Sequence, residues 1–195
     1  MSPASVTATA GGPVVHRAAQ SRIIAAALGL FAKHGVGGTS LAMIADEVGV
    51  TKAAVYHQFK TKDEIVLAAA QAELARLQAV VDDAEAQPTR KRARDALVTG
   101  IVALAVDSRR SMGVVLRDPV IVDFFSDHEE FQHTMDRMCR LLVGDATTHE
   151  ARVSAAMLTA AISGAVVHPF VAGLDDATLR AQLEQLARRF LRIPG

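Results

Sequence analysis

Apolar residues recur every three to four positions along most of the chain, which is the spacing of one face of an α-helix. In residues 18–34, Ile24, Leu28 and Phe31 follow this spacing. Gly35 comes next and is a typical helix stop. The pattern therefore predicts a first helix that ends just before Gly35.

Two shorter helices are expected next, with only a tight turn between them. One apolar stripe marks the earlier of the two, formed by Leu41, Ile44, Ala45 and Val48. Thr39 or Ser40 can cap this helix, and Gly49 can end it. Thr51 can cap the later helix, which runs to about Phe59. Two helices joined by so short a turn form a helix-turn-helix, whose second helix is a candidate for the DNA major groove.

The rest of the chain also has helical periodicity. Thr61 and Glu64 form a capping box that opens a long helix to about Asp83, and a break ending at Pro88 follows. Further helices are expected at residues 90–107, 110–117, 119 or 127 to 143, 148–167 and 175–192. We expect an all-α fold of about nine helices, with an N-terminal three-helix helix-turn-helix domain and a C-terminal helical domain. We expect the chain to divide into a disordered tail at residues 1–16, a DNA-binding domain at 17–62 and a second domain at 63–195.

Composition supports helices and an intracellular setting. Aromatic residues make up 4% of the chain and tryptophan is absent, so aliphatic side chains must fill the core. The single cysteine, Cys139, excludes an internal disulfide, and we expect a cytoplasmic protein. Residues 154–173 are mostly apolar, but their hydroxyl groups and Pro169 argue against a membrane span.

Charge is unevenly distributed although the net charge is zero. Residues 1–62 contain six Lys and Arg and two Asp and Glu, a net charge of +4. The remainder contains fifteen basic and nineteen acidic residues, a net charge of −4. A basic N-terminal third on an acidic remainder is typical of a nucleic-acid-binding head on a body with another task.

Residues 40–62 read SLAMIADEVGVTKAAVYHQFKTK. This segment resembles the DNA-binding domain of the TetR/AcrR family, whose hallmark is an Ile-Ala-x-x-x-Gly-Val turn, then Tyr-x-x-Phe and a lysine on the next helix. The matching residues are Ile44, Ala45, Gly49, Val50, Tyr56, Phe59 and Lys62. The resemblance covers about residues 17–70. It implies a transcriptional regulator that binds double-stranded operator DNA.

The resemblance also implies which residues contact DNA. The expected set lies at the starts of the helices around the turn: Thr39, Ser40, Thr51, Lys52, Ala53, Tyr56, His57 and Lys62. Thr51 and Lys52 are candidates for base contacts, or for contacts with both a base and a phosphate, because they begin the recognition helix. Phosphate contacts are expected from Thr39 or Ser40 and from Tyr56, His57 and Lys62. Arg22 and Lys60 are further phosphate candidates.

In proteins of this family the second domain binds a small-molecule effector and forms a homodimer. Bulky, adaptable apolar residues are the candidates for the effector pocket: Met112, Phe124, Phe125, Phe131, Met135, Met138 and Met157. The last two helices supply the candidates for the dimer interface: Ala156, Ala160, Gly164, Leu179, Leu183, Leu186 and Phe190. A two-fold dimer implies a near-palindromic operator.

Other functions have weaker support in the sequence. The chain has no GxSxG elbow, P-loop or CxxC pair, so we expect neither an enzyme nor a cofactor. Carboxylates and imidazoles gather at residues 127–133, but an acidic first helical turn that matches the helix dipole explains them better than a metal site. The serious alternative is a DNA-binding regulator that has no small-molecule effector and is constitutive or controlled by a protein partner.

Overall fold

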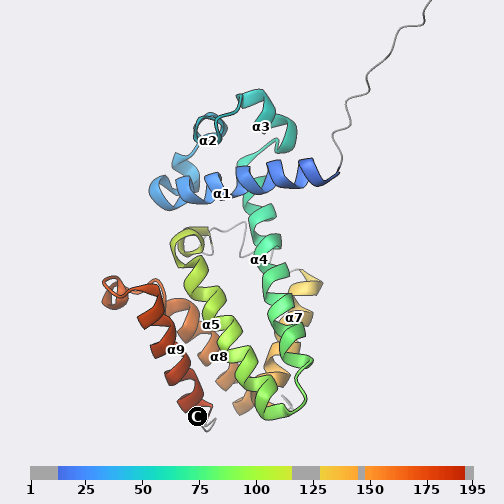
Figure 1. The fold of residues 1–195 in the computed structure, drawn as a ribbon, viewed down its shortest axis with the longest axis vertical. Helices are drawn as coiled ribbons and strands as arrows, with labels where there is room; N and C mark the ends of the chain where they lie inside the picture. Colours follow the sequence, from blue (N-terminus) through green and yellow to red (C-terminus); the bar gives the residue numbers. More distant parts are fainter. Residues whose placement is uncertain (1–12, 116–127, 145–147, 192–195) are drawn as a thin grey trace, which may run out of the picture.

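The computed structural model describes residues 13–115, 128–144 and 148–191, with the side chains of 13–17 and 110–115 left out. This part of the chain is all-α and contains no strand (Figure 1). Its helices are α1 (Pro13–Gly38), α2 (Leu41–Val48), α3 (Lys52–Gln58), α4 (Lys62–Glu85), α5 (Arg90–Val115), α7 (Glu129–Val143), α8 (His149–Ala165) and α9 (Asp176–Phe190). A short 3-10 helix, η1 (Pro169–Val171), lies between α8 and α9.

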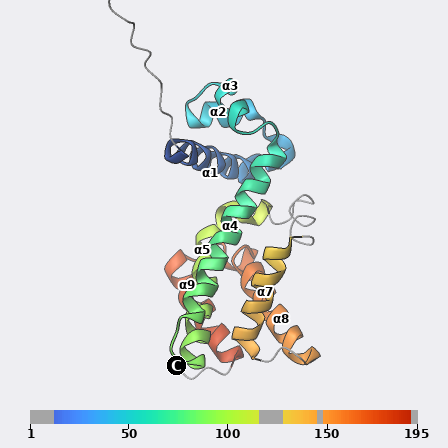
Figure 2. The ribbon, with the colours of Figure 1, turned by 90° about the vertical axis from the view of Figure 1, so that its right-hand side faces the viewer.

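The first three helices form a head at one end of an elongated molecule, and α4 runs from the head along the length of the body (Figures 1 and 2). The head core consists of buried apolar residues, among them Phe31, Ile44 and Val55, each fully buried. Two residues of the first turns of α4, Ile65 and Val66, belong to this core as well. Helix α4 is therefore part of the head at one end and part of the body at the other.

The body packs α4, α5, α7, α8 and α9 around a second core. Val81, Leu97, Leu142 and Leu179 are among its most deeply buried members and come from four different helices. Ion pairs join the helices at the surface. Arg137 on α7 binds Asp82, at 2.6 Å, and Glu85 on α4, while Arg188 on α9 binds Asp95 on α5 at 2.7 Å.

Most helices agree with the sequence prediction, and two predictions need correction. Helix α1 begins at Pro13, so the predicted tail of residues 1–16 is too long. The separate helices expected at 90–107 and 110–117 are one continuous helix, α5. Within the described residues, no helix combines the length and the apolar character needed to cross a membrane.

Candidate DNA interface and ligand cavity

Two glycines with a positive φ angle shape the head. Gly35 has φ 73° and interrupts the helical geometry of α1 near its end, as the sequence predicts. Gly49 has φ 74° and ends α2, where its N–H reaches the carbonyls of Ala45 and Asp46. Side chains other than glycine rarely adopt this backbone conformation. These glycines therefore fix the path of the chain into and out of α2.

Short-range caps then orient α2 and α3. The Ser40 hydroxyl accepts from the Met43 N–H at 3.2 Å, and the Thr51 hydroxyl accepts from the Ala54 N–H at 3.2 Å. Both are N-caps on exposed positions, as the sequence predicts. Each hydroxyl uses its oxygen in the cap and keeps its hydrogen for another acceptor.

Helix α3 divides its side chains between the core and solvent. Val55 is fully buried and Phe59 is 6% exposed, so these residues fix the helix to the head. Lys52, Ala53 and His57 are exposed, and Tyr56 is 53% exposed. Within the described part of the chain, Lys52 has no hydrogen bond or ion pair. The outer face of α3 thus offers a cation, an aromatic hydroxyl and an imidazole to a partner.

Lys60 is tied to the same face. Its ammonium donates to the Tyr56 carbonyl at 2.9 Å and lies 4.7 Å from the centre of the Tyr56 ring. This arrangement combines a helix C-terminal cap with a cation–π contact. It holds a positive charge against the tyrosine ring, at the end of α3.

Two of the predicted phosphate contacts, Thr39 and Lys62, have structural roles in the head. Thr39 is 2% exposed, and its hydroxyl donates to the Gly35 carbonyl at 2.9 Å. Lys62 is half-buried, and its ammonium donates to the carbonyls of Val36 at 2.7 Å and Gly37 at 3.2 Å. The prediction for Thr39 is wrong because this residue is buried, whereas the phosphate contact of Lys62 stays a prediction, since its ammonium keeps a third hydrogen. Thr39 closes the turn after Gly35, and Lys62 clamps the start of α4 to the end of α1.

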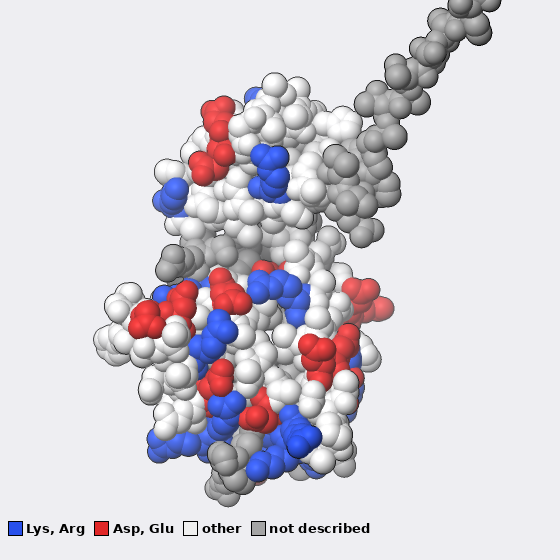
Figure 3. Space-filling view, viewed as in Figure 1, with Lys and Arg blue, Asp and Glu red and all other residues white. Residues whose placement is uncertain are grey.

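The remaining cations of the head are also dispersed. Arg22 donates to the Val48 carbonyl at 3.2 Å, at the end of α2. On the face drawn in Figure 3, the head carries a few separate charged side chains, and basic and acidic side chains alternate over the body. The net charge of +4 in residues 1–62 is thus not one continuous basic patch on this face.

The capping box of α4 differs from the expected form. The Thr61 hydroxyl accepts from the Glu64 N–H at 3.1 Å, as predicted. The Glu64 carboxylate, however, accepts from the Lys60 N–H at 2.7 Å, one residue before the cap. This bond connects the end of α3 directly to the first turn of α4.

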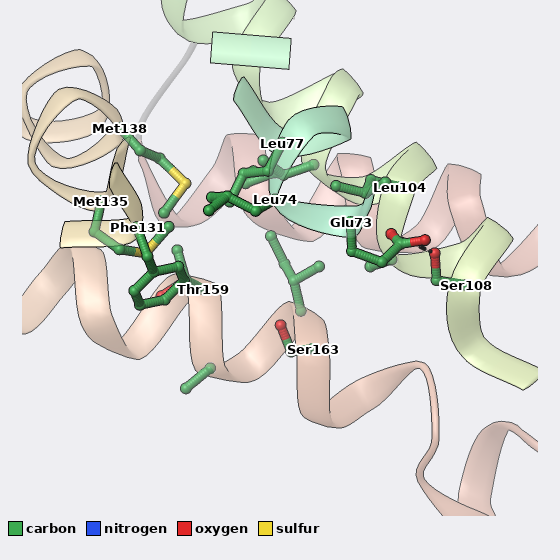
Figure 4. Close-up of a pocket in the computed structure, with 14 residues that line it drawn as sticks. Glu73, Leu74, Leu77, Leu104, Ser108, Phe131, Met135, Met138, Thr159 and Ser163 are labelled. Atoms are coloured by element: carbon green, nitrogen blue, oxygen red, sulfur yellow. Dashed lines mark hydrogen bonds between the residues drawn. The ribbon is translucent and has the colours of Figure 1, made fainter. Parts of the chain in front are cut away.

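The body contains a cavity of about 400 Å³ between four helices (Figure 4). The lining side chains are mostly apolar and come from α4, α5, α7 and α8: Glu73, Leu74, Leu77, Ile101, Leu104, Ala105, Ser108, Phe131, Met135, Met138, Thr159, Ala160, Ile162 and Ser163. Its size lies within the range of small-molecule sites, which are concave and mainly apolar with a few polar groups.

Three of the seven predicted pocket residues line this cavity: Phe131, Met135 and Met138. Met157 is 58% exposed and does not line it, so that prediction is wrong for this cavity. Phe124, Phe125 and the side chain of Met112 lie outside the described residues.

Glu73 and the leucines of α4 line the cavity but are not among the predicted pocket residues. A usable signal existed, because Val66, Ala69, Glu73 and Leu77 follow one helical stripe. A carboxylate on an otherwise apolar stripe points into the body. At the cavity, this carboxylate accepts from the Ser108 hydroxyl at 3.1 Å (Figure 4).

The predicted dimer residues divide into two groups. Leu179 and Leu183 are 2% and 9% exposed and belong to the body core, which corrects their assignment to an interface. Leu186 and Phe190, on the outer side of α9, are 54% and 48% exposed. On α8, Ala156, Ala160 and Gly164 are exposed, and Ala160 also lines the cavity.

The acidic and imidazole residues of 127–133 form no metal site in the described part of the chain, where no group of three potential ligands is close enough. Glu129 and Glu130 occupy the first turn of α7, where they match the helix dipole. Asp127 lies outside the described residues.

The head resembles one known protein family in sequence, and nearly the whole chain resembles solved structures in fold. Residues 23–69, which contain α2, α3 and the start of α4, match the model described as "Bacterial regulatory proteins, tetR family". No curated protein sequence matches the chain.

Solved structures match nearly the whole length. A bacterial regulatory protein in the tetR family from Rhodococcus RHA1 is 24% identical, with a TM-score of 0.68 over 91% of this chain and 98% of that one. A putative fatty acid metabolism regulator from Clostridium perfringens is 16% identical, with a TM-score of 0.71 over 89% and 98%. The ketosteroid transcriptional regulator KstR2 of Mycobacterium tuberculosis is 16% identical, with a TM-score of 0.68 over 89% and 93%. At these identities the likeness shows a shared fold.

Proposed function

Residues 23–69 carry the helix-turn-helix domain of the tetR family of bacterial regulatory proteins, and from this premise we propose that the chain is a repressor that a small, largely apolar ligand releases from its operator. The chain is a DNA-binding transcriptional regulator of the TetR type. The observation that supports the ligand-dependent part is the cavity of about 400 Å³, because α4 both lines it and leaves the head.

The DNA-binding surface in this proposal is the exposed face around α2 and α3. Lys52 and Thr51 read bases, since both lie at the start of the recognition helix. Ser40, Tyr56 and His57 contact phosphates, and Ala53 offers a methyl group to thymine. Thr39 is removed from the predicted contacts because it is buried. Lys62 acts by holding the surface in place.

Helix α4 provides the link between cavity and DNA. Its first residue, Lys62, is clamped to the end of α1, and Glu64 accepts from the backbone at the end of α3. Glu73, which lines the cavity, lies eleven residues after Lys62. At a rise of 1.5 Å per residue, the two residues are about 16 Å apart along the helix. A ligand that shifts α4 therefore shifts the head, and the operator affinity falls if the ligand prefers the shifted state.

Dimerisation sets the spacing of the two heads. Apolar side chains that a monomer leaves exposed lie at intervals of four residues on each of the last two helices: Val153 and Met157 on α8, and Leu186 and Phe190 on α9. Helices α8 and α9 also contact each other in the body. A two-fold dimer through these rows would present two α3 helices to a near-palindromic operator.

Selection of bound sequences from random duplex DNA tests this function. The full chain should enrich a near-palindrome, and a bacterial metabolite extract should abolish the enrichment. Lys52→Ala should blur the preference at one position of each half-site, whereas Lys33→Ala, which removes an exposed lysine of α1, should leave the motif unchanged. A motif that resists every extract would favour a regulator without a small-molecule effector. No motif at all would contradict the assignment of α3 as a reader of DNA.

A further inference from the structure

The two ends of the cavity differ chemically. Phe131, Met135 and Met138 from α7 form an aromatic and thioether end, while Glu73 and Ser108 lie together at another part of the wall (Figure 4). Among the described residues, the lining contains one carboxylate, that of Glu73, which pairs with Arg76, and no lysine, arginine or histidine. Any polar group of a ligand must therefore suit a negative charge inside a mainly apolar space.

The Glu73 carboxylate has capacity for one more donor. Arg76 donates to both oxygens, at 2.9 and 3.2 Å, and Ser108 donates to Oε2 at 3.1 Å. A carboxylate has about four acceptor positions, so these three bonds leave one, on Oε1. The Glu73 side chain is 21% exposed, and Glu73 is one of the residues that line the cavity.

Among the described residues, three hydroxyl groups line the cavity, and Ser108 and Thr159 use their hydrogens within the protein, which leaves Ser163 as a neutral donor. The Ser108 hydrogen is used on Glu73, while its oxygen accepts from Arg76 at 3.1 Å. The Thr159 hydroxyl donates to backbone carbonyls of its own helix, at 3.0 and 3.1 Å. Arg76, the cation beside Glu73, is already engaged with Glu73, Ser108 and Asp107. A ligand carboxylate would therefore meet the Glu73 oxygens without a free cation among the described lining residues, and an unpaired charge in such surroundings is costly.

We propose that the cavity binds an apolar molecule with a hydrogen-bond donor at one end, an alcohol or a protonated amine, and that Glu73 accepts from this group. The proposal rests on the proposed function, because it takes this cavity to be the effector site. The apolar part of the ligand lies along Leu74 and Leu77 toward Phe131 and the methionines. Molecules whose polar end is a carboxylate are excluded.

Three probes of equal chain length test the ligand class: 1-decanol, decylamine and decanoate, each below its micelle concentration at neutral pH. Their affinities are measured by displacement of the neutral fluorescent probe N-phenyl-1-naphthylamine from the full-length protein. Decylamine and decanol should bind about tenfold or more tightly than decanoate, because only they donate to Glu73. Equal affinities, or tightest binding of decanoate, would overturn the proposal while the cavity itself remains a binding site.

Variants assign the preference to Glu73. Glu73→Gln keeps the shape, and its amide oxygen at the Oε2 position can still accept from Ser108 and Arg76, while its NH2 group replaces the Oε1 acceptor by a donor. This variant should reduce the preference for decylamine over decanoate to less than about threefold. Glu47→Gln, which removes an exposed carboxylate of the head, is the matched control. Ser108→Ala removes a bond of the same network but keeps the charge, so it should retain the preference. A Glu73→Gln protein with unchanged preference would overturn the role of Glu73. Absence of saturable N-phenyl-1-naphthylamine binding would overturn the cavity as effector site and this inference with it.

Discussion

The head and the body of this chain position their functional side chains in different ways. In the head, the directions of α2 and α3 are set by two N-cap hydrogen bonds, each to an N–H three residues later, and by two glycines with a positive φ angle. In the body, a carboxylate on α4, a hydroxyl on α5 and thioethers on α7 meet only because distant helices pack together. The head is filled at its centre, whereas the body keeps an apolar space beside its core. The head is thus joined, both through α4 and through the contact of α1 with α5, to a body that keeps an apolar space.

The largest expected effects come from truncating side chains in the two regions. Phe31→Ala should lower the free energy of unfolding by about 3–5 kcal/mol and abolish DNA binding, because Phe31 is fully buried in the head core. Leu77→Ala should cost no more than about 2 kcal/mol, since this half-buried side chain already borders open space. Urea unfolding of both variants measures the difference. Equal losses would mean that the cavity is not open in solution.

Two lysines of the head should separate positioning from contact. Lys62→Met leaves the Val36 and Gly37 carbonyls without their ammonium donor, so stability should fall by about 1–3 kcal/mol. The affinity for the operator should fall too, but the slope of the logarithm of this affinity against the logarithm of the salt concentration should stay unchanged. Lys52→Met should leave stability unchanged and make the log-log salt slope less steep by about 1.8 for a dimer, if each Lys52 neutralises one phosphate. A reduced slope for Lys62→Met would show that Lys62 contacts phosphate after all.

The smallest expected effect concerns pH and the body. The hydrogen bond from Arg137 holds the pKa of the Glu85 carboxyl below its ordinary value of 4.5. The stabilisation is therefore complete above pH 4.5 and is lost as the pH falls through the lower, folded-state pKa. Because Glu85 is 41% exposed, the effect should be less than about 1 kcal/mol. Thermal unfolding between pH 6 and 3 should show a shallower loss for Glu85→Gln than for the unaltered protein, and parallel curves would contradict this role of the pair.

Much of the head could be predicted because its determinants are local. Gly35, Gly49, Ser40 and Thr51 act on residues within five positions, which a sequence displays directly. The role of Lys62 could not be predicted in this way, because its acceptors lie 25 and 26 residues earlier and are backbone carbonyls.

The body was harder to predict because periodicity does not say which neighbour covers an apolar face. Leu179, Leu183, Leu186 and Phe190 form one apolar series, yet the first two face the core and the last two face solvent. The difference depends on where α5 and α8 lie relative to α9. Glu73 was overlooked for a related reason, since a charged residue on a long helix is ordinarily at the surface.

The central claim is that the cavity and the operator-binding surface are energetically coupled. The most direct measurement is the affinity of the full-length protein for N-phenyl-1-naphthylamine, with and without saturating operator duplex. Coupling is reciprocal, so a ligand that weakens operator binding tenfold must itself bind tenfold more weakly to the operator complex, a difference of about 1.4 kcal/mol. We expect a reduction of at least this size. Equal affinities in the two states would contradict release of the operator through this cavity.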